Sequence, residues 1–276
     1  MVTTDTSSAY ESEIRLWQQE MEANLRAEDG WLTLAGLYWL HPGSNTIGTN
    51  PGSDIILPDS SLPDFLGVIE FIDEQTMLQV EGASPVTVDG HPTISAALRN
   101  DHAEEGPSVV KIGSVTFFVI RRGQEYGVRV RDANHPSRLN FAGRKWFPVS
   151  QDYRVEGRFV LHETPRVLDI PTSTGRQTSI LNPGRVEFTL NHQLLSLEAF
   201  EADSDLVWFI FRDATSNRTT YGAGRFMYGE LRADGTVLLD FNKAYHPPCA
   251  FTPFATCPLP PRENWLTVEI SAGERS

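Results

Sequence analysis

Both cysteines of the chain lie in one short run, HPPCAFTPFATCPLPP. A thiolate at Cys249 or Cys257 could act as a nucleophile if a neighbouring cation or dipole lowered its pKa. Three other roles stay open for the two thiols, namely buried packing, a disulfide and zinc binding. Zinc would use His246, with His162 and His192 as further candidate ligands. We take the two cysteines as candidate catalytic residues and expect no metal and no cofactor.

The same run contains six of the 18 prolines of the chain. Each proline removes a backbone donor and restricts φ, so neither a helix nor a central strand can form here. Apolar residues such as Phe251 and Phe254 predict that the run is a rigid loop pinned onto its domain. Binding and catalytic residues often lie on such loops. We therefore expect this loop to form the lip of a concave polar site.

A carboxylate and an amide lie just before the loop, in GTVLLDFNKAY (235–245). Strand alternation would place Asp240 and Asn242 on one face, about 7 Å apart. Asp240 is the third candidate catalytic residue, as a general base, and the pair could orient a substrate hydroxyl or amine. The alternative is that Asp240 caps a turn and Asn242 bonds to local backbone.

A glycine-rich turn is expected in RTTYGAGRFMYGE (218–230), because glycine permits backbone geometry that other residues avoid. Its amides, with the guanidinium of Arg225, could hold a carboxylate or phosphate. The alternative is a hairpin in which Arg225 pairs with a surface acid. We expect a small polar or anionic ligand to be bound by Tyr221, Gly222, Gly224, Arg225, Asn242 and Tyr245.

One helix is predicted, from Ser8 to Leu25, capped by Ser7 or Ser8. Its apolar residues recur at helical spacing, at Ile14, Trp17, Met21 and Leu25. The apolar run WLTLAGLYWL (31–40) then predicts a segment buried beneath the first sheet.

From residue 43 onward, turn signals separate short β-rich runs about every 8–12 residues, which is typical of all-β proteins. No second long helical period appears, which argues against a βαβ architecture. The last expected strand is WLTVEIS (265–271). The prediction is an all-β, mainly antiparallel fold with an N-terminal helix and two β-rich domains packed together. We place the helix and apolar segment in 1–42, a first β domain in 43–150, and a C-terminal β domain in 151–276.

Charge and composition exclude several classes of protein. The net charge of −13 and the pI near 5.0 argue against a nucleic-acid partner. No stretch is apolar enough for a signal peptide or a membrane helix, so we expect no membrane partner and a cytoplasmic location. A protein partner stays open.

The segments GSNTIGTNPGSDIILPDSSLPDFLGVIEF and VTVDGHPT resemble the opening of a forkhead-associated (FHA) domain. Such domains are β-sandwiches that bind phosphothreonine peptides through loops at one end. The family normally has a phosphate-gripping arginine after Ile47-Gly48, where this chain has Thr49. The usual serine, arginine and histidine after Asp59 are replaced by SSLPDFLG. Without a guanidinium, phosphate loses a bidentate partner, so the resemblance implies a packing scaffold.

The C-terminal segments from LVWFIFRDATSN to TVEISAGER resemble the bacterial family known as domain of unknown function 1684. The resemblance implies a family and no activity. Arg212 and Asp213 are interpreted as an ion pair at a strand end. His246 departs from the pattern, because the family usually has asparagine there, which weakens the zinc hypothesis. The motif positions are Arg212, Asp213, Tyr221, Gly222, Gly224, Arg225, Asp240, Asn242, Tyr245, Cys249 and Cys257.

Three functions stay open from sequence alone. The preferred one is binding of a small polar or anionic ligand in the C-terminal domain. The second is a hydrolase that uses Asp240 or a cysteine, although the chain lacks the G-x-S-x-G and H-E-x-x-H motifs. The third is an interaction scaffold built on the FHA-like sandwich. Whether the protein is an enzyme is left open.

Overall fold

A computed structural model describes residues 3–82, 84–202 and 205–276. Its contacts divide the chain into unit 1, Met1–Asn24 with Ala142–Ser276, and unit 2, Leu25–Phe141. The boundaries expected from sequence lay after residues 42 and 150, whereas the contacts group most of the N-terminal helix with the C-terminal strands. Among the described helices, none is both long and apolar enough to cross a membrane.

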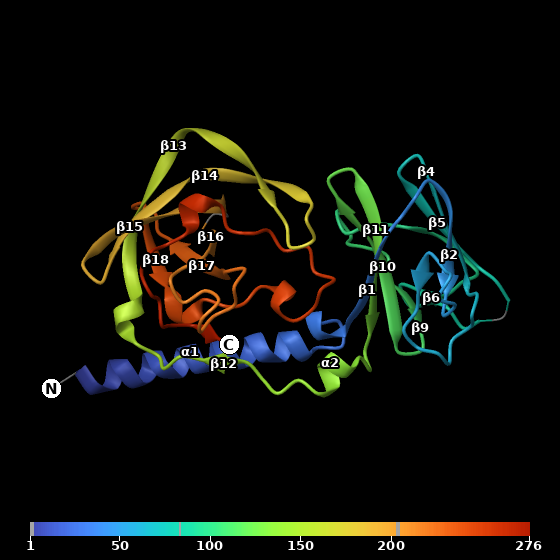
Figure 1. Ribbon diagram of the computed structural model, residues 1–276, viewed down its shortest axis with the longest axis horizontal. Helices are drawn as coiled ribbons and strands as arrows, with labels where there is room; N and C mark the ends of the chain where they lie inside the picture. Colours follow the sequence, from blue (N-terminus) through green and yellow to red (C-terminus); the bar gives the residue numbers. More distant parts are fainter. Residues whose placement is uncertain (1–2, 83, 203–204) are drawn as a thin grey trace. The chain divides into compact units, whose positions relative to one another are not determined.

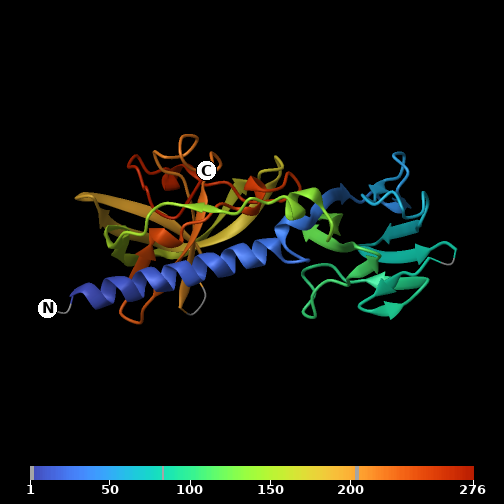
Figure 2. The same ribbon diagram turned by 90° about the horizontal axis from the view of Figure 1, so that it is seen from below.

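Helix α1 spans Thr3–Arg26 and confirms the predicted N-terminal helix. It begins before the expected start, so Ser8 lies inside the helix and does not cap it. The part of the predicted apolar face that belongs to unit 1 packs within that unit, where Ile14 is fully buried and Trp17 meets Trp146 edge to face at 5.5 Å between ring centroids. Figure 2 shows α1 running along the strands of this unit. Burial of one apolar face explains why the helix forms here.

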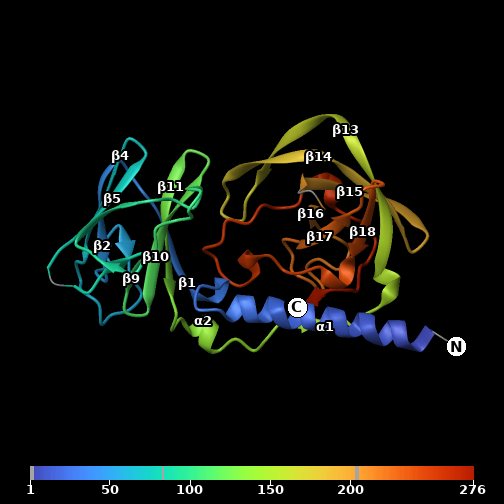
Figure 3. The ribbon, with the colours of Figure 1, turned by 180° about the vertical axis from the view of Figure 1, so that it is seen from behind.

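Unit 2 is the predicted β-sandwich, made of two sheets that face each other across one core (Figure 3). Ile69 from one sheet and Phe117 from the other are both fully buried in that core. A short helix, α2 (Pro136–Leu139), follows the last strand. The six-stranded sheet has the order β1 (Leu34–Trp39), β11 (Glu125–Asp132), β10 (Val115–Arg122), β9 (Val110–Ile112), β6 (Thr87–Val88) and β7 (His91–Pro92). The five-stranded sheet has the order β3 (Ile55–Ile56), β2 (Gly43–Gly48), β4 (Gly67–Ile72), β5 (Gln75–Val80) and β8 (Ser95–Leu98).

The apolar run at 31–40 does not pass beneath a sheet, so that prediction was wrong. It forms a single 3-10 turn, η1 (Trp31–Thr33), and then strand β1, which pairs with β11 as an edge of the six-stranded sheet. A segment buried beneath a sheet would leave its backbone N–H and C=O groups without partners. Pairing with β11 satisfies those that face this neighbouring strand.

The strands of unit 1 close into a six-stranded antiparallel barrel (Figure 1). The closure is made by the last strand, which pairs with the first. A further two-stranded pair joins β12 (Lys145–Trp146) to β19 (Glu274–Arg275). The barrel strands are β13 (Arg154–Pro171), β14 (Gln177–Leu190), β15 (Gln193–Ala202), β16 (Leu206–Phe211), β17 (Arg225–Leu231) and β18 (Thr236–Asp240).

The barrel core is completed by the C-terminal segment 266–272. Its alternate residues join the buried cluster that contains Phe209 and Phe241. The predicted strand at 265–271 is wrong, because the described chain has no strand there. The backbone bonds instead to the chain just after β16, as when Leu266 N donates to Arg212 O at 2.8 Å. The buried residues of the segment are Leu266, Val268, Ile270 and Ala272.

Candidate functional site

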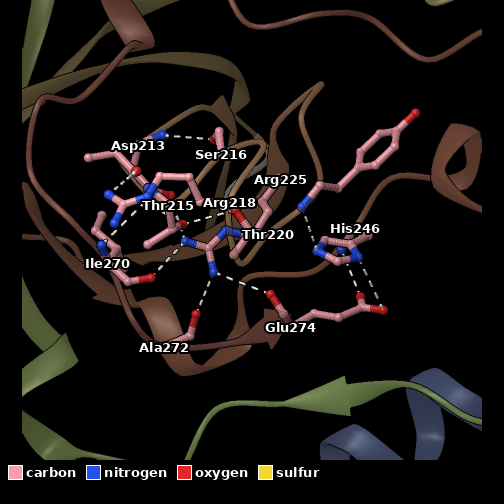
Figure 4. Close-up of polar contacts among 12 residues, drawn as sticks. Asp213, Thr215, Ser216, Arg218, Thr220, Arg225, His246, Ile270, Ala272 and Glu274 are labelled. Carbon is pink, nitrogen blue, oxygen red and sulfur yellow. Dashed lines mark hydrogen bonds and ion pairs between the residues drawn. The ribbon is translucent and has the colours of Figure 1, made fainter. Parts of the chain in front are cut away.

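Arg225 lies at the start of β17 and is buried inside unit 1 (Figure 4). Its Nη2 donates to Asp213 Oδ2 at 2.7 Å and to Ile270 O at 3.0 Å, while Nη1 donates to Ala272 O. The two charged side chains are 1% and 0% exposed. Arg225 therefore binds an internal carboxylate, which replaces the predicted external anion.

The partner of Asp213 is thus Arg225, and the expected pair between Arg212 and Asp213 is wrong. Asp213 Oδ1 accepts hydrogen bonds from Thr215 N at 2.8 Å and from Thr215 Oγ1 at 2.6 Å. Arg212 lies over the ring of Trp265, with its guanidinium carbon 4.5 Å from the centroid. Its charge is directed to an aromatic face and not to a carboxylate.

The predicted glycine turn is present before β17. Gly224 has φ +104°, where a Cβ would lie 2.6 Å from Phe211 O, so a side chain is excluded. A Cβ at Gly222 would overlap the side chain of Asn217. Gly224 N donates to Tyr221 O at 3.1 Å. The glycines allow close packing, and the Gly224 amide is used internally.

Asp240 and Asn242 hold a hydroxyl, but it belongs to helix α1. Tyr10 Oη donates to the Asp240 carboxylate, at 2.9 and 3.0 Å from its two oxygens, and accepts from Asn242 Nδ2 at 2.9 Å. Burial and the charge of Asp240 raise the pKa of Tyr10. Asp240 also caps the 3-10 helix η3 (Phe241–Lys243), accepting from Asn242 N at 3.1 Å. The capping alternative is therefore the one observed, and a general-base role for Asp240 would require Tyr10 to leave.

The strand ends at Asp240, so the period-two argument for Asn242 fails. The chain turns into η3 and brings Asn242 Nδ2 to 3.0 Å from Asp240 Oδ1, in place of the expected separation of about 7 Å. Asn242 also donates to Ser150 O at 2.8 Å. Asn242 therefore ties the backbone at Ser150 to the cluster of Tyr10 and Asp240.

The proline loop is pinned to the hairpin between β13 and β14. Leu259 N donates to Pro171 O at 2.8 Å, and Ser173 Oγ donates to Ala255 O at 2.7 Å. Side-chain and backbone bonds therefore fix a segment that lacks strand partners over most of its length.

The two cysteines are thiols that lie close together in this loop. Cys249 N donates to Cys257 Sγ at 3.3 Å, and Tyr221 Oη donates to Cys249 O at 2.9 Å. A hydrogen bond from Cys257 lowers the pKa of Cys249 to about 7, and hydrogen bonds from Tyr221 and Ser173 act in the same direction. Cys249 is partly exposed, whereas Cys257 is buried.

His246 is fixed beside a buried ion pair between Arg144 and Glu274. Its Nε2 accepts from Tyr221 N at 3.2 Å, and its backbone N donates to Glu274 Oε2 at 2.7 Å. Burial lowers the pKa of His246 to about 3, helped by repulsion from Arg225 and Arg144. The imidazole is therefore neutral in the folded protein.

The larger of the two cavities described here has a volume of about 540 Å³ and lies at an irregular part of β13. The register between β13 and β14 shifts between Leu161 and Arg166, so the intervening residues leave the ladder and form a concave surface. The lining residues are Leu161, His162, Glu163, Thr164, Pro165, Arg166 and Arg185.

His162 is the best-anchored side chain of this cavity, and its side chain is only 5% exposed. Its Nε2 lies 2.9 Å from Asn182 Oδ1 and 3.0 Å from Glu198 Oε2. The amide nitrogen of Asn182 already donates to Gly184 O and Ala199 O, so its oxygen faces His162 as an acceptor. Two acceptors place the imidazole proton on Nε2.

The smaller cavity, of about 220 Å³, has aromatic walls. Of the residues predicted to bind a ligand, Tyr245 lines it. The other lining residues are Trp17, Met21, Tyr228 and Lys243.

Residues 139–275 match a family model described as protein of unknown function, DUF1684. This chain belongs to the DUF1684 family. An uncharacterised protein of Haloarcula marismortui, solved by NMR, is 38% identical. The match covers 50% of this chain and 79% of that one, with a TM-score of 0.42. No curated protein matched the chain.

Two solved FHA domains also match this DUF1684 member. One is an FHA domain from a study of phosphothreonine-dependent interactions, 19% identical, covering 34% of this chain and 92% of its own, with a TM-score of 0.24. The other is the FhaA FHA domain bound to the intracellular domain of Rv3910, at 20% identity, 36% and 96% coverage, and a TM-score of 0.26. Scores this low carry no argument about function.

The expected phosphate-binding position of the sandwich is occupied by a threonine beside an acid. Thr49 Oγ1 donates to Asp64 Oδ1 at 3.0 Å. A carboxylate at this position repels phosphate, where an FHA domain would place a guanidinium. We therefore do not propose phosphopeptide binding for unit 2.

Replacing His246 with asparagine, the residue that the family resemblance implies at this position, is expected to reduce the acid sensitivity of folding. The pKa of the histidine drops from 6.5 to about 3 on folding, so below pH 6.5 the unfolded chain binds a proton that the folded chain rejects. Stability from this group is complete above pH 6.5 and is lost as the pH falls toward 3. The loss is about 1.4 kcal/mol per pH unit, or about 2 kcal/mol at pH 5.

Urea unfolding of both proteins at pH 7 and pH 5 measures this difference, since all other titrating groups are shared. Equal pH dependence of the wild-type protein and the His246→Asn variant would contradict the lowered pKa of His246.

The predicted single site is not formed as expected. Asp240 lies in a hydrogen-bonded cluster with Tyr10 and Asn242. Arg225 and Cys249 belong to a second cluster, in which Glu274, His246 and Tyr221 connect them. None of the three predicted residues lines either cavity described above. The described residues contain no group of three or more histidine, cysteine or acidic side chains placed to hold a metal ion. Sequence analysis missed the His162 cavity, because its partners come from β14 and β15 and are recognised only once the register is known.

Proposed function

We propose that unit 1 binds a small anionic molecule in the cavity of β13, lined by residues 161–166 and Arg185. The observation that carries the proposal is that Arg166 and Arg185 line one concave surface of about 540 Å³ beside an anchored imidazole. This volume is in the range of small-molecule sites. The proposal keeps the predicted ligand class and the predicted cytoplasmic location, and it moves the site from Arg225 to β13.

The two guanidiniums are suited to a carboxylate or phosphate. Arg185 donates from Nε and Nη2 to Glu187 Oε1, at 3.0 and 2.8 Å, in a partly exposed pair. Such pairs are worth little in water, so an incoming anion can compete for the guanidinium. Arg166 is exposed. Because the chain as a whole is acidic, attraction must be local, and affinity should fall as salt is added.

His162 gives the site a fixed polar group. Glu198 and Asn182 hold Nε2, which leaves Nδ1 as the imidazole acceptor for a donor on the ligand. A side chain locked by buried partners costs little entropy when a ligand binds. A ligand that carries both an anionic group and a donor therefore fits this site best.

The test measures binding to inorganic phosphate, a dicarboxylate and a nucleoside monophosphate by thermal shift and calorimetry. Arg166→Ala with Arg185→Ala is expected to weaken binding about 100-fold or more, because each of the two lost charge-assisted bonds contributes about 1.5–3 kcal/mol. The matched control is Arg232→Ala, an exposed barrel arginine paired with Glu156. Equal affinities in the double variant and the control would overturn the proposal, as would binding of none of the three probes.

A further inference from the structure

We propose that Cys249 and Cys257 are a reversible dithiol–disulfide site, in which Cys249 is attacked first by a peroxide and Cys257 resolves it. The site is separate from the cavity of β13 and does not depend on ligand binding there. Its substrates are a small hydroperoxide in the oxidising direction and a thiol in the reducing direction.

The two cysteines lie close to each other in the loop. Cys257 Sγ accepts a hydrogen bond from Cys249 N at 3.3 Å, which places it beside the backbone of the other cysteine. The Cys257 thiol also acts on the Cys249 thiol, whose pKa it lowers. A disulfide needs the two cysteine backbones to be close, and this contact brings the sulfur of Cys257 to the backbone of Cys249.

Both cysteines are held in place by hydrogen bonds to residues outside their own loop. Cys257 N donates to Ser173 Oγ at 3.1 Å, and Ser173 N donates to Cys257 O at 2.8 Å. Tyr221 Oη fixes Cys249 O at 2.9 Å. The two thiols are therefore presented to each other by the turn after β13 and by the glycine turn, so their effective concentration is high.

The difference in exposure gives the pair an order of reaction. Cys249 is partly exposed, whereas Cys257 is 5% exposed, so a dissolved peroxide reaches Cys249 first. Because its pKa is lowered to about 7, Cys249 carries more thiolate at neutral pH than an ordinary cysteine, and the thiolate is the reactive form. The more exposed of the two cysteines is also the one with the lowered pKa.

The chemistry balances with the peroxide as the only oxidant. The thiolate of Cys249 attacks one peroxide oxygen, the O–O bond breaks, and a sulfenic acid and a hydroxide form. The hydroxide takes the proton released from Cys249 and becomes water. The Cys257 sulfur then attacks the sulfenic sulfur and expels a second hydroxide, which takes the Cys257 proton and leaves as water. Two thiols lose two electrons, and one hydrogen peroxide becomes two waters.

The chain has only two cysteines, so the test is direct. Full-length protein is treated with one equivalent of hydrogen peroxide at pH 7 and examined by thiol titration and intact mass. We expect both thiols to disappear together, with loss of two hydrogen atoms from a monomer, and dithiothreitol to restore them. Retained thiols, addition of oxygen atoms without a disulfide, or a disulfide-linked dimer would each overturn the proposal.

Variants that each lack one cysteine test which of the two thiols reacts with peroxide first. Cys257→Ser should leave a sulfenic acid at residue 249 that dimedone captures, whereas Cys249→Ser should react with peroxide at least about 10-fold more slowly, as expected for a buried thiol. Alkylation of Cys249 in Cys257→Ala, compared with wild type, should show a higher midpoint pH, because the bond from Cys257 is lost. Equal peroxide reactivity of the two single variants would overturn the order. Wild-type mass and thiol counts test the disulfide itself even if a variant fails to fold.

Discussion

Replacing Arg225 with alanine is expected to lower the free energy of unfolding by about 3–5 kcal/mol. The substitution leaves the Asp213 carboxylate charged inside the barrel and removes donors from the carbonyls of Ile270 and Ala272. An unpaired buried charge and unsatisfied acceptors cost far more than a surface ion pair. Urea unfolding followed by circular dichroism measures the loss.

Arg212→Ala is the matched control, because Arg212 is a neighbouring arginine that is half-buried and lies over Trp265. We expect it to cost about 1 kcal/mol or less. Asp213→Ala combined with Arg225→Ala should be less destabilising than the sum of the single changes, since the second removes the charge that the first left unpaired. A cost for Arg225→Ala no larger than that of Arg212→Ala would contradict a structural role for this ion pair.

Replacing Tyr10 with phenylalanine is expected to destabilise the docking of helix α1 by about 1–3 kcal/mol. The change keeps the ring and removes the hydroxyl that bonds to both Asp240 and Asn242, which leaves a buried carboxylate without that donor. Urea unfolding gives the total loss. Trypsin cleavage at Arg15, an exposed residue of α1, measures the local loss of stability at this helix, and the cleavage should become faster.

The control for this prediction is Ser12→Ala, because Ser12 lies on the exposed face of the same helix and bonds only within its own turn. It should change the stability by about 0.5 kcal/mol or less. If Tyr10→Phe and Ser12→Ala had the same stability and the same cleavage rate, Tyr10 would not be an anchor of α1.

Local patterns predicted the elements of this fold well. The spacing of Ile14, Trp17 and Met21 identified α1, alternation in 235–245 identified β18, and glycine at position 224 identified a turn. Each of these signals depends on residues within a few positions of one another, where backbone geometry alone sets which side chains share a face.

Long-range partners could not be predicted in the same way. Arg225 was interpreted as an anion-binding residue because its residue type suits an anion, and the type does not show whether the anion is a ligand or Asp213. Tyr10 and Asp240 are 230 residues apart in sequence, and no periodicity links them. The cavity of β13 depends on a register shift, which is set by the pairing of whole strands.

Unit 1 is discontinuous in sequence, with unit 2 inserted between α1 and the barrel. Translation therefore produces α1 first, then the whole sandwich, and residues 266–272 only after all six barrel strands. The sandwich can close its core while α1 still has no docking surface, because Asp240 has not yet been made. Until Leu266 to Ala272 have been synthesised, the nascent barrel exposes apolar surface that these residues cover in the complete fold.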